Sequence, residues 1–191
     1  MHSSDAVQVI FDIDESELKT KGLVCRLKKI TLNNLSNLKC VWKEKLGGIV
    51  SFPNLQEVVV IDCGSLVTLF SSSLARNLEK LKRLEIHLCK KLVEIVGKED
   101  AMENERTVIF VFPCLSILIL WRMTLLSCFY PEKHNLECPL LDKLHVGYCP
   151  KLKLFTSNFD DGRKGVIEAP IKPLQQPLFS VEILVKKHLT F

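Results

Sequence analysis

The chain contains eight cysteines, and these are the residues whose chemistry must be explained first. A cysteine can bind a metal, form a disulfide, act as a nucleophile or fill space as a small hydrophobe. Zinc sites generally use close pairs such as C-x-x-C, whereas the closest pair in this chain is Cys128 and Cys138. We therefore expect no metal site built from these cysteines.

Known catalytic motifs are missing from the sequence. The chain lacks G-x-S-x-G, H-E-x-x-H and the glycine-rich dinucleotide fingerprint, so we expect no enzyme activity and no cofactor. His87 and His145 fall on outward positions of predicted strands and are interpreted as ordinary exposed histidines, with switchable surface groups as the alternative. Asp12–Glu15 lacks the glycine and spaced ligands of a calcium loop and is interpreted as a solvated acidic turn.

An apolar pattern, L-x-x-L-x-L-x-x-C-x-x-L, recurs along the chain, with other apolar residues at some of its positions. Full copies begin at Leu27, Leu55, Leu81, Leu115 and Leu141, and a sixth begins at Leu178 and stops after Ile183. The start points lie 26 to 37 residues apart. This range is typical of leucine-rich repeats with insertions in some units.

Each copy of the pattern predicts one short strand. Alternating residues place two apolar side chains on one face of that strand, and the long spacing supplies the crossovers that parallel strands need. The predicted fold is an α/β leucine-rich-repeat solenoid, with a curved, parallel concave β-sheet and an irregular convex side with few short helices. Ser71–Leu84 is the best helix candidate, and we place it on the convex side.

The repeat also predicts how the chain is organised. We expect residues 1–20 to be the tail of a preceding repeat and residues 21–155 to form five repeats. Residues 156–177, rich in glycine, proline and charge, are predicted to be a flexible insertion, and residues 178–191 to start a sixth, truncated repeat. The charged segment Gly97–Thr107 is predicted to be an exposed loop.

Three of the cysteines share one position of the repeat. Cys63, Cys89 and Cys149 each follow a predicted strand, and Met123 and Leu35 take the same position in the other copies. A position that accepts leucine and methionine requires a buried apolar group rather than a ligand or a nucleophile. We therefore interpret these cysteines as structural.

Composition and charge restrict the classes of function. With 47% hydrophobic and 25% charged residues the chain is predicted to be globular, and a net charge of +4 with interspersed signs argues against a dedicated nucleic-acid binder. No apolar stretch reaches the roughly 18–20 residues of a membrane span. The amino terminus lacks the features of a signal peptide, so we expect reduced cysteines and a location in the cytoplasm or nucleus.

Some stretches are more distinctive than the repeat frame. They are "FPNLQEV", "FPCLSIL", "DCGSLVTLF", "YCPKLKLF", "LKKITLNNLSNLKCVW" and "SSSLARNLEKLKRLEI". Together they resemble the leucine-rich-repeat region of plant intracellular disease-resistance proteins of the coiled-coil, nucleotide-binding class. The resemblance extends roughly from Val7 to Leu184.

The resemblance implies a non-catalytic module of an immune receptor that recognises proteins. Its implied partners are a pathogen effector, a guarded host protein, or the receptor's own nucleotide-binding domain during autoinhibition. The phosphate loop G-x-x-x-x-G-K-[ST] does not occur in this chain, so bound ATP is not expected.

A second interpretation is a substrate-adaptor array of the F-box type, which also uses L-x-x-L-x-L-x-x-C repeats. Those repeats are more regular, and an Ile-Thr-Asp phrase typically follows the cysteine. Here Gly64-Ser65, Lys90-Lys91 and Pro150-Lys151 follow it instead.

Specificity is expected from the strand residues that point away from the buried ladder. Most are polar, but the fourth copy presents Ile117, Ile119 and Trp121. An apolar cluster with an aromatic anchor is typical of a protein-binding hot spot. The alternatives are that another part of a parent protein covers the cluster or that it has no role. The candidate protein-binding residues are Val59, Ile61, Arg83, Ile117, Ile119, Trp121, Arg122 and Tyr148.

Overall fold

The computed structural model describes residues 7–11, 23–42, 50–98, 108–132, 134–152 and 180–184, with backbone alone for residues 23, 50 and 180–184. The predicted acidic turn at Asp12–Glu15 and the predicted insertion at 156–177 lie outside these residues. So does most of the predicted loop Gly97–Thr107.

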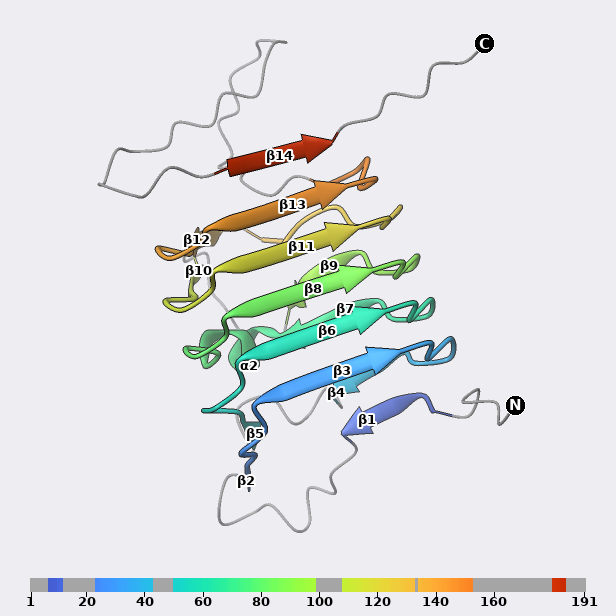
Figure 1. Cartoon of the computed structure of the whole chain (residues 1–191). Coiled ribbons are helices and arrows are strands. Elements are labelled where there is room, and N and C mark those ends of the chain that lie inside the picture. Colours follow the sequence, from blue (N-terminus) through green and yellow to red (C-terminus); the bar gives the residue numbers. More distant parts are fainter. Residues whose placement is uncertain are drawn as a thin grey trace, which may run out of the picture.

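The main element is a six-stranded parallel sheet with one strand from each copy of the repeat (Figure 1). Its strands, in spatial order, are β3 (Lys29–Asn33), β6 (Glu57–Ile61), β8 (Arg83–His87), β11 (Ile117–Trp121), β13 (Lys143–Gly147) and β14 (Ser180–Leu184). Equivalent residues of the repeat pair with one another, for example Val58 with Leu84 and Leu84 with Leu118. The predicted leucine-rich-repeat solenoid is confirmed.

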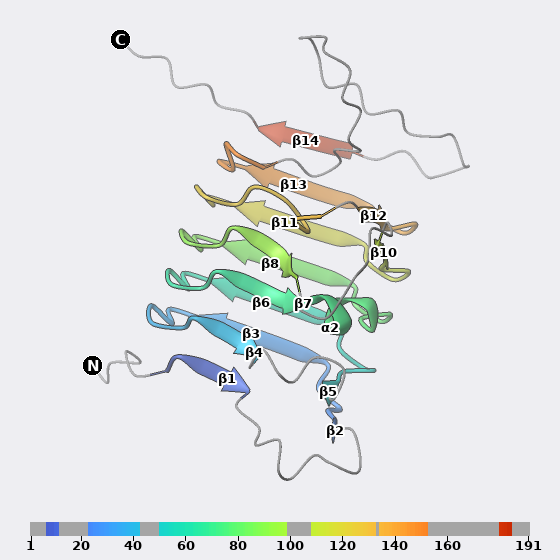
Figure 2. The same cartoon turned by 180° about the vertical axis from the view of Figure 1, so that it is seen from behind.

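A layer of short strands lies behind this sheet, on the convex side (Figure 2). β1 (Val9–Phe11) pairs with β4 (Cys40–Trp42), and β7 (Thr68–Ser71) pairs with β9 (Glu94–Gly97). Two further parallel pairs precede strands of the main sheet: β2 (Leu23–Val24) with β5 (Val50–Ser51), and β10 (Val108–Val111) with β12 (His134–Glu137). The convex side thus consists mainly of short strands.

The helix prediction was right only for its first part. The structure has α2 (Ser72–Arg76), and the Oγ of Ser71 caps it by accepting a hydrogen bond from the Leu74 amide at 3.3 Å. The chain then leaves the helix, because Leu81 and Leu84 belong to the next repeat and are buried in its frame. Pairing of β8 with β6 and β11 outweighs the helix propensity of residues 77–84.

The core lies between the two layers. Its strand positions are 0–7% exposed and comprise Ile30, Leu32, Val58, Val60, Leu84, Ile86, Leu118 and Leu120. The leading leucines at 55, 81, 115 and 141 are buried as well, whereas Leu27 in the first copy is 42% exposed. Each fully buried side chain of this kind contributes roughly 1.5–3 kcal/mol relative to an exposed one.

Aromatic side chains fill the convex layer at the start of the array. The rings of Phe11 and Trp42 stack with centroids 4.8 Å apart, and Phe52 meets Trp42 edge-on at 4.8 Å. The indole Nε1 of Trp42 donates to the Leu69 carbonyl at 2.6 Å, which joins two consecutive repeats. Within the described residues, no helix has the length and apolarity to cross a membrane.

Candidate functional site

The face of the six-stranded sheet that points away from the core is called the concave face below. On β11 the apolar residues Leu118 and Leu120 point into the core, so Ile117, Ile119 and Trp121 point outward. All three are half-buried, because neighbouring strands carry side chains at the same level. The sequence therefore builds an apolar row on a face that is elsewhere mostly polar.

Trp121 has its place because the residue beside it is glycine. Trp121 pairs in register with Gly147 on β13, and a Cβ atom at position 147 would lie 2.0 Å from Cζ3 of the indole. The ring centroid lies 5.0 Å from that of His145 and 4.9 Å from that of Tyr148, which it meets edge-on at 84°. The indole is thus packed between two aromatic neighbours directly over the Gly147 backbone.

Arg122 and Tyr148 occupy an unusual backbone position just after their strands. They belong to a ladder of residues with φ between 52° and 59°, formed by Asn34, Asp62, Leu88, Arg122 and Tyr148. The amides of the first four ladder residues donate to the last carbonyl of the next strand, as Arg122 does to Gly147 at 2.9 Å. Asparagine and aspartate tolerate this left-handed conformation, whereas for other L-residues it costs roughly 1–2 kcal/mol.

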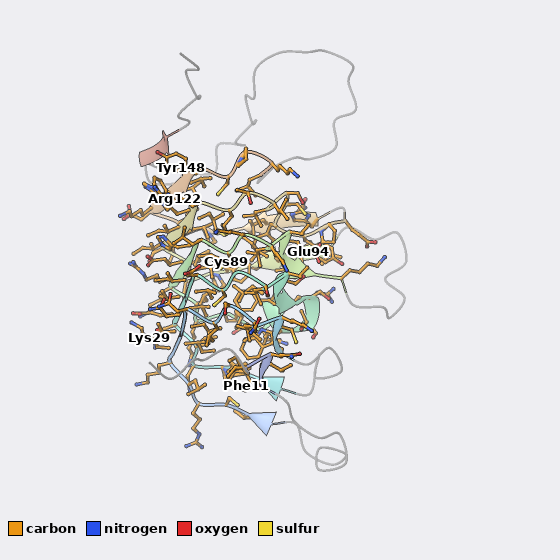
Figure 3. All side chains as sticks on the ribbon, turned by 90° about the vertical axis from the view of Figure 1, so that its right-hand side faces the viewer. Phe11, Lys29, Cys89, Glu94, Arg122 and Tyr148 are labelled. Atoms are coloured by element: carbon orange, nitrogen blue, oxygen red, sulfur yellow. The ribbon has the colours of Figure 1, made fainter. Side chains whose placement is uncertain are left out.

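Of the three ladder residues that are neither asparagine nor aspartate, Arg122 and Tyr148 contact each other. The Arg122 guanidinium lies 5.6 Å from the ring centroid of Tyr148, a cation–π distance. Figure 3 shows both residues close together on the sheet side of the molecule, opposite Glu94 on the convex side. Backbone strain that places functional side chains is common at binding sites.

On the neighbouring strand β8 the outward side chains form an ionic row. Arg83 Nε donates to Glu85 Oε2 at 2.9 Å, and Nε2 of His87 lies 2.7 Å from Glu85 Oε1. Burial opposes ionisation of Glu85, but the hydrogen bonds and positive charge of Arg83 and His87 lower its pKa. Arg83, predicted to flank the apolar cluster, is therefore already engaged by Glu85.

A shallow, open hollow of about 300 Å³ lies over these strands. It is lined by His87, Ile119, Trp121, Lys143 and His145. The two histidines are not exposed as the sequence interpretation expected, because the side chain of His87 is 24% exposed and His145 packs on the indole. Both become part of the surface around Trp121.

The structure brings together some of the predicted residues and separates others. One surface contains four of them: Ile119, Trp121, Arg122 and Tyr148. These four residues, together with Lys143, His145 and Gly147, are called the Trp121 patch below. Val59 and Ile61 lie on β6, and the Glu85–His87 row on β8 stands between them and the patch. Sequence reasoning missed Gly147, whose signal was a glycine in a column of larger residues.

Of the three cysteines that share the repeat position, Cys63 and Cys89 are buried and Cys149 is half-buried. Cys63 and Cys89 are 0% exposed, and their thiols donate to the carbonyls of Ile61 and His87, two residues earlier, at 3.7 and 3.3 Å. The contact with Cys63, together with burial, raises the pKa of Cys89, and burial raises the pKa of Cys138 to about 12. The structural interpretation of the buried pair Cys63 and Cys89 is confirmed.

The fold and this surface define a class: a leucine-rich-repeat solenoid with an aromatic patch on its sheet. Comparison with protein families adds that residues 1–90 match the family described as plant disease resistance protein RPS2-like, leucine-rich repeats. This match, over just under half of the chain, supports a leucine-rich-repeat region of a plant resistance protein and a role in plant disease resistance. Such repeats mediate protein interactions. No solved structure matches the chain.

Proposed function

We propose that the chain is a non-catalytic recognition module of an intracellular plant immune receptor, acting in the cytoplasm or nucleus. It binds a pathogen effector or a guarded host protein through the Trp121 patch. In the resting receptor, the same surface contacts the receptor's own nucleotide-binding domain and contributes to autoinhibition. The family match favours this function over an F-box-type adaptor.

One observation carries the proposal: an aromatic surface assembled at a conformational cost. Stability alone would favour Asn or Gly at the strand-end ladder, yet its last three residues are Leu88, Arg122 and Tyr148, and the last two contact each other beside Trp121. A half-buried tryptophan with tyrosine and arginine neighbours has the composition of a binding hot spot. The eight free thiols support a reducing compartment.

The test compares the proteins that surround the chain in leaf cells. We expect proximity labelling with the wild-type chain to enrich a partner that the double variant Ile119→Asp, Trp121→Ser loses. The matched control is Val67→Ser, Val93→Asp, which alters two exposed apolar residues, 47% and 38% exposed, that precede β7 and β9. This control should retain the partner.

A thermal melt of each purified variant ensures that a loss of partner does not reflect unfolding. If the folded double variant keeps every wild-type partner, the Trp121 patch is not the recognition surface. Activation of defence by the double variant in the absence of a pathogen would assign the patch to autoinhibition.

A further inference from the structure

We propose that the Trp121 patch recognises an acidic peptide segment that carries an apolar side chain. This inference rests on the proposed function and specifies the chemistry of its partner. The apolar side chain packs against Trp121 and Ile119, and one or more carboxylates lie beside Arg122 and Lys143. The argument rests on charge, on the arrangement of donors and on the shape of the surface.

Over the five strands whose side chains the structure describes, the concave face has two electrostatic halves. On β8, β11 and β13, with the residues that end them, the outward side chains include three cations and one carboxylate: Arg83, Arg122, Lys143 and Glu85. On β3 and β6, with the residues that end them, carboxylates outnumber cations: the outward side chains include Glu57 and Asp62 but only one cation, Lys29. Lys29 is neutralised by Glu57, since its Nζ lies 2.9 Å from Oε2.

The one carboxylate among the outward side chains of β8, β11 and β13 already has ion-pair partners. Glu85 binds Arg83 and His87, and among the described residues no carboxylate lies within ion-pair distance of Arg122 or Lys143. Glu182 stands beside His145 in the register of β14, one strand further from Trp121. Among the described side chains, the cations nearest to the indole are thus those that have no ion-pair partner.

Arg122 is held in a way that suits a carboxylate. Its guanidinium carbon lies over the Tyr148 ring, 5.6 Å from the centroid. The five N–H donors lie in the plane of the guanidinium and can bind a carboxylate with two parallel hydrogen bonds. Arg122 is exposed beside Tyr148, so these donors stay accessible.

The shape of the hollow favours a peptide side chain over a larger ligand. Its volume of about 300 Å³ lies at the small end of ligand sites, and it is open to solvent. Stacking of successive nucleic-acid bases needs free aromatic faces. Here Trp121 packs on His145 and Tyr148, and Arg122 covers Tyr148, so single-stranded nucleic acid is disfavoured.

The test selects random displayed peptides on the purified 191-residue chain and, in parallel, on Trp121→Ser. Peptides enriched only by the wild type should contain Asp or Glu next to a large apolar residue. A labelled consensus peptide is then titrated by fluorescence anisotropy. We expect Arg122→Gln, Lys143→Gln to bind it roughly tenfold more weakly, because the double variant removes both exposed ion pairs with the peptide.

The matched control, Lys28→Gln, Lys39→Gln, removes two exposed charges from the first repeat and should bind the peptide as the wild type does. Trp121-dependent peptides without acidic residues would overturn the inference and leave the proposed function standing. A labelled oligothymidine that binds more tightly than the peptide would also overturn it. If no peptide depends on Trp121, the recognition surface itself is wrong.

Discussion

At the scale of the residue, the Trp121 patch depends on the absence of a side chain at the neighbouring position, Gly147. Gly147 leaves the space into which the indole packs, and every other position in its column of the sheet carries a side chain. The sequence predicted that Trp121 points outward, because the repeat assigns each residue to one of two faces. It could not predict the packing over Gly147, because the direction in which the indole lies depends on the side-chain conformation of Trp121.

Gly147→Ala should displace the Trp121 ring. The added Cβ meets the indole at 2.0 Å, so the ring must move, with an expected loss of about 1–3 kcal/mol of stability. Tryptophan fluorescence and urea denaturation measure both effects. The control is Gly64→Ala, where nothing lies within 4 Å of the new Cβ. Equal stability and equal spectra for the two variants would contradict the packing described here.

Arg122→Asn should stabilise the fold while it weakens peptide binding. Asparagine tolerates the φ of 55° at this position, so part of the strain is relieved and stability rises by roughly 0.5–1 kcal/mol. Urea denaturation gives the change, with Lys90→Asn in the adjacent turn as the control. A destabilised Arg122→Asn would show that arginine is there for stability rather than for binding.

At the scale of the element, pairing between strands decides more than local propensity. The strand positions follow from the L-x-L frame, and the register of the sheet matches the alignment of the repeats. The helix was predicted too long, because residues 77–84 have helical spacing but must also supply Leu78, Leu81 and Leu84 to the core. The ionic row of β8 was missed, since which charges pair along one strand depends on side-chain conformation.

The row on β8 predicts a sensitivity to acid. The pKa of Glu85 is lowered in the folded chain, so its contribution to stability is complete above the ordinary pKa of 4.5 and is lost as the pH falls through the lower folded value. Glu85→Gln should therefore be less stable than the wild type at pH 7 and approach it in acid. Denaturation midpoints measured across this range test the prediction, with the exposed Glu79→Gln as control. A difference in stability between Glu85→Gln and the wild type that does not change with pH would contradict it.

At the scale of the whole molecule, the described repeats form one stack in which the sheet joins each unit to its neighbours. A substitution in a repeat in the middle of such a stack disturbs the interfaces with both neighbouring repeats. A substitution in a repeat at the edge of the stack disturbs only one such interface. Leu120 and Leu32 occupy the same repeat position, at 0% and 7% exposure, in β11 and β3. They therefore allow a matched comparison.

Leu120→Ala should cost about 2–5 kcal/mol and lower the cooperativity of unfolding, because it leaves a cavity between two repeats. Leu32→Ala should cost less, since β3 is the edge strand of the six-stranded sheet. Urea denaturation followed by circular dichroism measures both. Equal losses at the two positions would argue against stability that is set by neighbouring repeats.

The most direct test of the recognition surface is photo-crosslinking in leaf cells with p-benzoylphenylalanine at position 119 of the concave face. The same group at Val111, an exposed residue of β10 on the convex side, serves as control. We predict a covalent adduct with a discrete protein partner from position 119 that is absent from position 111 and disappears with Trp121→Ser. An adduct from position 111 alone, or one from position 119 that survives Trp121→Ser, would contradict the account.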